Sequence, residues 1–231
     1  MVTTTSVSGM AVARFKKICL DAAQPLTAGP FWAEILGLGW QPDAKGEGGL
    51  YDADGRCIIW VNQVPQVNPV KRRVHLDMYA TALGPLLTLG CHIVLFEGDD
   101  RRWTVLADPE GGEFCAFLRP DPPKETLHGL GIDCADAAAQ ARWWGNVYGG
   151  TVTDSEAGFS TITDVPGVNF TMDFAPVPEP KSGPNSVHWD VAGDVAALRA
   201  VGATVLREPG GDISWHIMAD PEGNEFCVFS E

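Results

Sequence analysis

Four short segments carry the side chains best suited to chemistry. His precedes Asp by two residues in Val74–Asp77 and in Val187–Asp190, and Glu precedes Cys by two residues in Glu113–Cys115 and in Glu225–Cys227. Imidazole, carboxylate and thiolate groups bind transition metals and also transfer protons. Alternate residues of a strand share one face, so each pair would project to the same side of a sheet. The sequence therefore predicts two sets of ligand-binding candidates, His75, Asp77, Glu113 and Cys115 in the first and His188, Asp190, Glu225 and Cys227 in the second.

Structural roles for the same residues stay open beside these functional ones. A histidine in a sheet can be satisfied by a neighbouring carboxylate, and a glutamate after a turn can simply close it. Phenylalanines flank both cysteines, which favours thiols buried in a core. Trp103 and Trp215 precede the Glu-Cys segments, where an indole either fills the core or forms the apolar wall of a pocket.

An internal repeat fixes how these residues are organised. The segment 106–117 returns as 218–229, a displacement of 112 residues, and the same displacement relates Trp103 to Trp215 and Phe31-Trp32 to Trp143-Trp144. A conserved displacement over this length indicates two homologous halves. A chain of 231 residues is also long enough for two domains of ordinary size.

Each half is itself doubled. A pattern of apolar, small or His, apolar and Asp occurs at 18–21, 74–77, 130–133 and 187–190, with starts 56, 56 and 57 residues apart. Apolar spacing in the first unit predicts a strand at 17–22, a helix at 26–36 and strands at 49–51 and 57–61. The second unit predicts a strand at 74–79, a helix at 83–89, a strand at 92–96 and two strands that flank a turn at Asp108–Gly111. Each unit is thus a half-domain with the order strand, helix, then two or three strands.

Paired βαβββ units, a His-bearing strand after a Pro-rich joint (65–73 and 176–186) and a closing Asp-Pro-Glu-Gly hairpin resemble the glyoxalase/bleomycin-resistance/dioxygenase superfamily. The chain looks most like the actinobacterial glyoxalase-like branch. The resemblance implies an α+β fold of two tandem vicinal-oxygen-chelate domains, each of two βαβββ modules that form a half-open sheet cup. We expect a flexible tail at 1–11, domains at 12–120 and 127–231, and a Pro-rich linker at 121–126.

The resemblance also implies how a metal would be held. Metal-dependent relatives supply about four ligands, and His75 and His188 match one of those positions. The other positions hold Lys17 or Cys19 in the first half and Gly129 or Gly131 in the second, then Asn62 and Ala175, then Cys115 and Cys227. A divalent Zn, Fe, Mn or Ni ion would therefore meet an incomplete set, unless His, Asp, Glu and Cys form a rearranged site.

Two functional hypotheses follow from the incomplete ligand set. The first is a protein that binds a small organic molecule in the cup without the full metal-ligand set and has no other cofactor. The second is a divalent-metal-dependent lyase, isomerase or ring-cleaving dioxygenase, with His75 or His188 as a ligand and an acidic neighbour as general base. In a third arrangement, one half has lost its site and serves as a scaffold. The substrate, the catalytic residues and the choice of monomer or homodimer are left open by the sequence.

Composition excludes several other classes. A formal net charge of −14 opposes binding to nucleic acid or to anionic membranes. The first residues lack the pattern of a secretory signal, and no apolar run is long enough to span a bilayer, which favours a cytoplasmic protein with reduced cysteines. Nucleotide-binding glycine loops and the Gly-x-Ser-x-Gly and His-Glu-x-x-His motifs are also missing from the sequence.

Overall fold

A computed structural model describes residues 3–6, 11–66, 71–98 and 102–230 of the chain. Within these residues the four predicted βαβββ modules are confirmed. The first half contains β2 (Ala13–Ala22), α1 (Pro25–Leu36), β3 (Gly39–Pro42), β4 (Gly48–Tyr51) and β5 (Cys57–Gln63), followed by β6 (Val74–Ala80), α2 (Leu83–Thr88), β7 (His92–Leu95), β8 (Thr104–Ala107) and β9 (Glu113–Leu118). The second half contains β10 (Leu127–Cys134), α3 (Ala137–Tyr148), β11 (Thr151–Asp154), β12 (Ser160–Thr163) and β13 (Thr171–Pro176), followed by β14 (Val187–Gly193), α4 (Val195–Ala200), β15 (Thr204–Arg207), β16 (His216–Ala219) and β17 (Glu225–Phe229).

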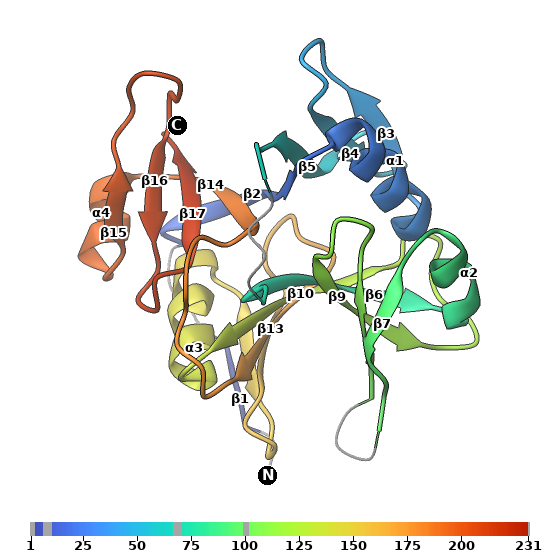
Figure 1. The fold of residues 1–231 in the computed structure, drawn as a ribbon. Coiled ribbons are helices and arrows are strands. Elements are labelled where there is room, and N and C mark those ends of the chain that lie inside the picture. The colour runs from blue at the N-terminus through green and yellow to red at the C-terminus, as the bar shows by residue number, and fades with distance from the viewer. Residues whose placement is uncertain (1–2, 7–10, 67–70, 99–101, 231) are drawn as a thin grey trace.

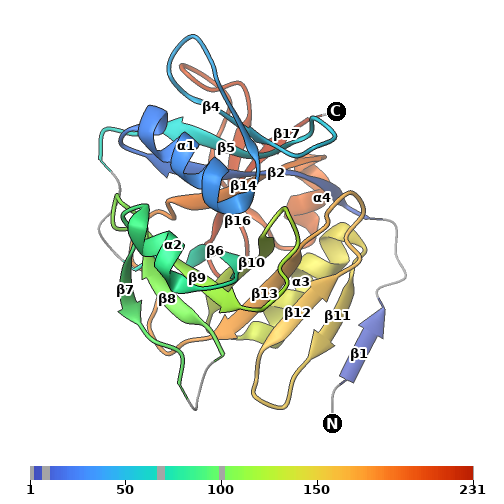
Figure 2. The same cartoon turned by 90° about the vertical axis from the view of Figure 1, so that its right-hand side faces the viewer.

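The modules pair across the two halves of the chain. Modules two and three, together with the N-terminal strand β1 (Thr3–Ser6), form a nine-stranded sheet, sheet A, with the order β1-β11-β12-β13-β10-β6-β9-β8-β7. Modules one and four form an eight-stranded sheet, sheet B, with the order β15-β16-β17-β14-β2-β5-β4-β3. In Figure 1 sheet B lies above sheet A, and Figure 2 shows the same arrangement from the side. The modules and their curved sheets match the expectation, and each sheet combines one module from the first half of the chain with one from the second.

Antiparallel pairs of first strands join the modules at the centre of each sheet. In sheet A, β6 pairs with β10, so that His75 lies opposite Gly131 and Asp77 opposite Gly129. In sheet B, β14 pairs with β2 with the corresponding register. Within every module the first strand runs parallel to the last one, as β6 does beside β9. The chemically interesting residues of strands far apart in the sequence therefore lie side by side.

The N-terminal segment also departs from the expectation. Thr3–Ser6, predicted as part of a flexible tail, form the strand β1 and pair antiparallel with β11 at the edge of sheet A. Residues 1–2 and 7–10 of the predicted tail, and 67–70 of the first Pro-rich joint, lie outside the described residues. The linker 121–126 contains neither helix nor strand, in keeping with its prolines.

The repeated Asp-Pro-Glu-Gly segment has a structural role in both halves. Asp220 accepts hydrogen bonds from the backbone N–H groups of Glu222 and Asn224 at 3.0 and 2.9 Å, which shapes the turn between β16 and β17. Glu222 then accepts from the N–H groups of Ala135 and Asp136 at 2.6 and 2.8 Å, next to the start of α3. Glu110 does the same for Ala23 and Gln24 before α1. The motif thus ties each closing hairpin to the first helix of a module in the same half.

We expect Glu222→Ala to lower the free energy of unfolding by about 1–2 kcal/mol, because two backbone donors at a helix start lose a charged acceptor. Chemical denaturation of the variant measures this loss. Glu110→Ala should give a similar value, because its two contacts are equivalent. Glu34→Ala, at an exposed position inside α1, is the control and should change stability by only a few tenths of a kcal/mol. Equal stability of Glu222→Ala and the unmodified protein would contradict this role.

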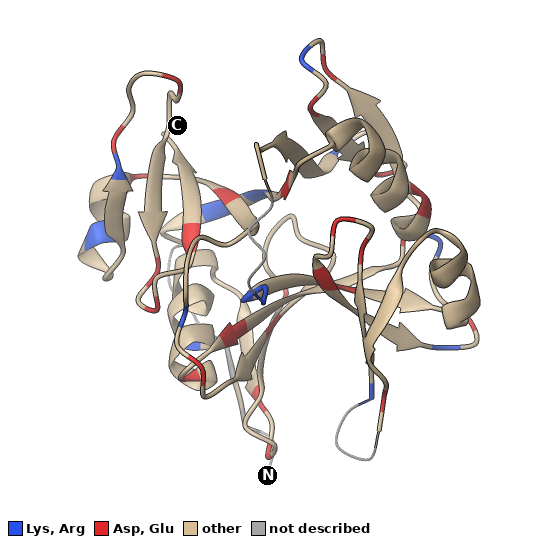
Figure 3. Ribbon diagram, viewed as in Figure 1, with Lys and Arg blue, Asp and Glu red and all other residues tan. Residues whose placement is uncertain are grey.

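Acidic residues occur in strands of both sheets as well as in loops, with fewer basic residues among them (Figure 3). The acidic residues are therefore spread along the described chain and not confined to one segment. None of the described helices combines the length and the apolar composition needed to cross a bilayer.

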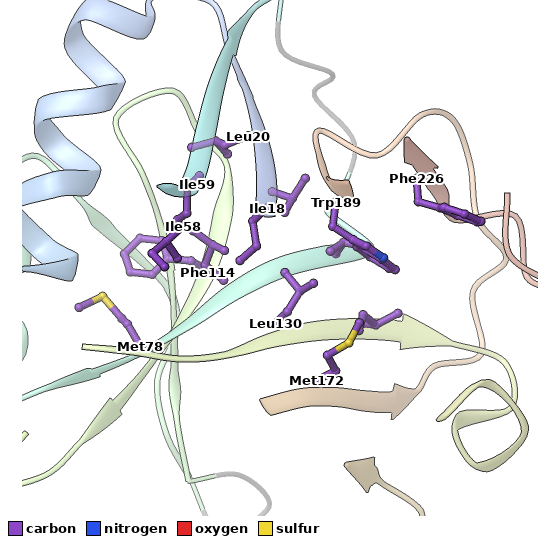
Figure 4. Close-up of a cluster of buried hydrophobic side chains, with 14 of the residues drawn as sticks. Ile18, Leu20, Ile58, Ile59, Met78, Phe114, Leu130, Met172, Trp189 and Phe226 are labelled. Atoms are coloured by element: carbon purple, nitrogen blue, oxygen red, sulfur yellow. The ribbon is translucent and has the colours of Figure 1, made fainter. Parts of the chain in front are cut away.

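The hydrophobic core contains residues of both sheets and of helices α1 and α3. Figure 4 shows part of it, with Ile18 and Trp189 from sheet B and Leu130 and Met172 from sheet A. Leu76 and Met78 on β6 belong to the same core. Because side chains alternate along β6, His75 and Asp77 point to the other face of sheet A.

Candidate functional site

A cavity of about 470 Å³ lies over the face of sheet A that carries His75 and Asp77. Its volume falls within the range typical of small-molecule sites. Both halves of the chain contribute to its wall. The lining residues are Lys71, His75, Asp77, Trp103, Val105, Glu113, Phe114, Cys115, Phe117, His128, Gly131, Asp133, Phe159, Asp173, Ala175, Pro176 and Val177.

Three of the candidate residues converge at the floor of this cavity. His75 and Asp77 come from β6 and Cys115 comes from the adjacent β9, where it pairs with Asp77. One ligand atom of each lies within 4.8 Å of the other two. His75 Nδ1 and Asp77 Oδ1 are buried and only 2.8 Å apart, the distance of an ion pair between a protonated imidazole and a carboxylate. Each is the other's partner when the imidazole carries a proton, and a metal ion can replace that proton.

Gly131 makes room for the imidazole. A Cβ atom built on Gly131 would lie 2.2 Å from His75 Cε1 and 2.7 Å from each ring nitrogen, far inside contact distance. The sequence analysis treated Gly129 and Gly131 as positions that lack a ligand. In the structure, Gly131 instead provides the space in which the ligand candidate on the neighbouring strand lies.

The electrostatic environment couples the three side chains. Burial disfavours the charged imidazole, but Cys115 and Asp77 outweigh that cost and raise the pKa of His75 well above its usual value. Burial also raises the pKa of the Cys115 thiol, despite the nearby imidazole. A proton therefore remains within this cluster around neutral pH unless a cation displaces it.

Asp173, on β13, adds a further carboxyl group to the cavity. It lies opposite Gly131 in the parallel pair of β10 and β13, and it accepts hydrogen bonds from the hydroxyl groups of Thr161, at 2.7 Å, and Thr171. Burial raises the pKa of Asp173 above its usual value, although both hydroxyls favour its ionised form. This carboxyl group can hold or release a proton more readily near neutral pH than an exposed aspartate can.

A β-bulge turns His128 toward the cavity. Leu127 and Gly129 pair with the consecutive residues Met78 and Asp77, so His128 is an extra residue on β10. Bulges of this kind redirect side chains next to functional sites. The His128 ring stacks on Tyr79 with 4.4 Å between centroids and meets the Phe117 ring edge-on at 5.1 Å. The equivalent bulge of β2 falls at Lys16, whose ammonium group lies 4.1 Å from the centre of the Phe229 ring.

Aromatic rings form the apolar part of the cavity wall. The Trp103 ring lies 5.6 Å from Phe117 and 6.1 Å from Phe159, measured between centroids. Trp103 thus contacts the cavity, one of the two roles that the sequence left open. Glu113 also lines the cavity, whereas Lys71 is bound to Asp133 at 2.7 Å. The wall is apolar on one side and acidic on the other.

The second set of candidates, on sheet B, is arranged differently. Cys19, His188 and Asp190 form a compact cluster whose ligand atoms also lie within 4.8 Å of one another. Cys227 pairs with Asp190 along the strand, and Trp215 stacks on Phe229 at 5.4 Å. Glu225 lies outside the cluster, since it binds Lys181 at 2.7 Å and the backbone N–H of Asn185 at 3.2 Å.

The structure therefore brings all four first-set residues and Trp103 to one cavity but divides the second set. The sequence alone did not point to Asp173, Phe117, Phe159 or His128 as residues of the site. It also chose Ala175 for the β13 position, whereas both Ala175 and Asp173 line the cavity. The pairing register of β10 with β13, which aligns Gly131 with Asp173, was the missing information.

Comparison with known proteins fits this geometry. The sequence profile of the family described as "Glyoxalase-like domain" matches residues 17–117 and again 129–229. The chain belongs to the glyoxalase-like domain family. The two tandem glyoxalase-like domains and their place in the glyoxalase/bleomycin-resistance/dioxygenase superfamily are thereby confirmed. No curated protein matches the sequence.

Solved structures share the fold of this glyoxalase-like protein at low sequence identity. Glyoxalase I from Zea mays superposes with a TM-score of 0.66 at 14% identity, over 94% of this chain and 92% of that one. A putative dioxygenase from Bacillus subtilis subsp. subtilis str. 168 superposes with a TM-score of 0.65 at 12% identity, over 96% of this chain and 86% of that one. At these identities the likeness shows the common fold alone.

Proposed function

We propose that the cavity of sheet A binds a small organic molecule beside a single divalent metal ion held by His75, Asp77 and Cys115. The observation that carries this proposal is the convergence of one imidazole, one carboxylate and one thiol at the cavity, with ligand atoms within 4.8 Å of one another. A divalent cation can replace the protons of the buried imidazole and thiol and bind the lone pairs that are freed. The residues present therefore fit a metal ion.

The donor set indicates which metals are suitable. One imidazole, one carboxylate and one thiolate are typical of zinc, and the thiolate disfavours the hard ions Mg²⁺ and Ca²⁺. Three protein ligands with a position open toward the cavity are the pattern of catalytic sites rather than structural ones. When bound, such an ion polarises an oxygen atom of the organic molecule.

Other residues of the chain would position the molecule and handle its protons. Trp103, Phe117 and Phe159 offer an apolar surface for a ring or an alkyl group. Asp173, on β13, pairs with Gly131 of β10 and has a raised pKa. Its carboxylate can therefore take a proton from one atom of the bound molecule and return it to another. This favours a lyase or isomerase, reactions that depend on proton transfer, over simple sequestration.

One observation supports metal-free binding as a second candidate. A distance of 2.8 Å also suits an ion pair between a protonated His75 and Asp77, and the raised pKa of His75 is compatible with that state. In this case the cavity would bind a neutral or cationic molecule through its aromatic and acidic walls, with no metal.

Titration with Co²⁺ separates the two candidates. We expect untagged protein stripped of metal to bind one equivalent and to develop the absorption of a cobalt–thiolate bond. Cys115→Ser should lose that absorption, whereas Cys91→Ser, at a buried thiol outside the cavity, should keep it. Elemental analysis of the protein as purified gives an independent count. The metal-based proposal is abandoned if the protein contains no metal and cobalt produces no thiolate absorption.

A further inference from the structure

The cluster on sheet B repeats the one on sheet A with one change in its surroundings. His188 and Asp190 occupy the same places on β14 that His75 and Asp77 occupy on β6. A sulfur atom completes each cluster, from Cys115 in sheet A and from Cys19 in sheet B. By donor type alone, both clusters could hold the same kind of ion.

The difference lies on the neighbouring first strand. Asp77 pairs with Gly129, whereas Asp190 pairs with Lys17. Lys17 Nζ lies 2.6 Å from Asp190 Oδ2, and the thiol of Cys19 donates a hydrogen bond to Asp190 Oδ1 at 3.3 Å. Both carboxylate oxygens of Asp190 therefore have partners outside the imidazole, while Asp77 Oδ1 lies 2.8 Å from His75 Nδ1 and faces a glycine on the neighbouring strand.

The Lys17 ammonium group and the Asp190 carboxylate form a close, largely buried pair. The Lys17 side chain is 22% exposed and that of Asp190 is 4% exposed, so the pair is largely shielded from water. The lysine thus supplies the positive charge that balances the buried carboxylate of this cluster.

We propose that Lys17 closes a second metal site, formed by Cys19, His188 and Asp190, by placing its own ammonium group on the carboxylate. Removal of that group opens the site to a transition-metal ion. The comparison with sheet A rests on the proposed function, but the inference itself concerns residues of sheet B alone. The chain would then hold one metal because a single residue of β2 differs from its counterpart on β10.

Lys17→Met tests this proposal, because methionine keeps most of the side-chain length without the charge. We expect Co²⁺ to bind with two equivalents per chain instead of one. Lys17→Gly, which copies Gly129, should behave in the same way. Lys17→Arg keeps the charge and should remain at one equivalent. Circular dichroism of each variant checks that it is folded.

A His75→Ala background separates this proposal from the function proposed for sheet A. His75→Ala alone should bind no cobalt, and His75→Ala with Lys17→Met should bind one equivalent. If the unmodified protein binds none while Lys17→Met binds one, the inference stands and the metal proposal for sheet A fails. Folded Lys17→Met with no more cobalt than the unmodified protein would overturn the inference.

Lys17→Met leaves a buried carboxylate without its cation, so the variant can be unstable without metal. In that case we expect Zn²⁺ to restore folding and to raise the melting temperature more than it does in the unmodified protein. Lys17→Met combined with Asp190→Asn removes both charges and should fold without gaining a site. Failure of zinc to stabilise Lys17→Met, with this double variant folded, would also overturn the inference.

Discussion

Gly131→Ala is expected to weaken metal binding in the sheet A cavity by about 100-fold, although it changes none of the three ligands. The added Cβ would lie 2.2 Å from His75 Cε1, so the imidazole must leave its position beside Asp77. Displacement separates the donor atoms that now lie within 4.8 Å of one another. Cobalt titration followed by thiolate absorption measures the loss of affinity.

Gly39→Ala provides a matched control for this substitution. Gly39 also lies in a strand, and a Cβ there would meet only the Tyr51 carbonyl oxygen at an ordinary 3.8 Å. Its cobalt affinity should equal that of the unmodified protein. Unchanged affinity in a folded Gly131→Ala variant would show that the His75 imidazole does not take part in binding.

Asp220→Ala is expected to lower the free energy of unfolding by about 3–5 kcal/mol, among the largest effects of any single substitution in this chain. Asp220 accepts from two backbone N–H groups and from the side chains of Trp144, at 3.1 Å, and Gln140. Alanine would leave these buried donors without an acceptor. Urea denaturation, monitored by tryptophan fluorescence and by circular dichroism, measures the loss.

Asp220→Asn distinguishes the hydrogen bonds from the negative charge. Burial raises the pKa of Asp220, so its charge is already disfavoured, and asparagine retains one acceptor oxygen for the turn. We expect Asn to cost less than half as much as Ala. Cobalt binding in the sheet A cavity should remain, because Asp220 lies outside the residues that line it. Equal losses for Asn and Ala would indicate that the charge, and not the acceptor geometry, stabilises this turn.

The repeat made much of the fold predictable. The helix expected at 26–36 is observed at Pro25–Leu36, where Gly37 ends it with a left-handed φ of 69°, and the strand expected at 74–79 is observed at Val74–Ala80. The short strand Gly39–Pro42 was missed, because its glycine and its proline are typical of a helix end and a turn. Local patterns identify such elements well when apolar spacing is regular.

Pairing between modules could not be predicted, since no local pattern marks which first strands will meet. The contact of β2 with β14 joins Leu20 to Val187 across most of the chain. Without the register, Asp173 could not be assigned to the site. For the same reason Gly131 was interpreted as a missing ligand, whereas its lack of a side chain leaves room for the His75 imidazole. The residues of the candidate site were thus recognisable by chemical type, while their partners depended on long-range strand order.

The crossed pairing of modules has a consequence for how the gene can change. Each half of the polypeptide supplies one side of both sheets, so neither repeat is a self-sufficient unit that could be deleted or exchanged alone. Separation of the halves would expose unpaired backbone N–H and C=O groups of central strands such as β6 and β10. Such strands pair readily with strands of other chains. The two repeats therefore depend on each other for folding. One of the two clusters of candidate ligands can lose its function while the strands that carry it remain necessary for the fold.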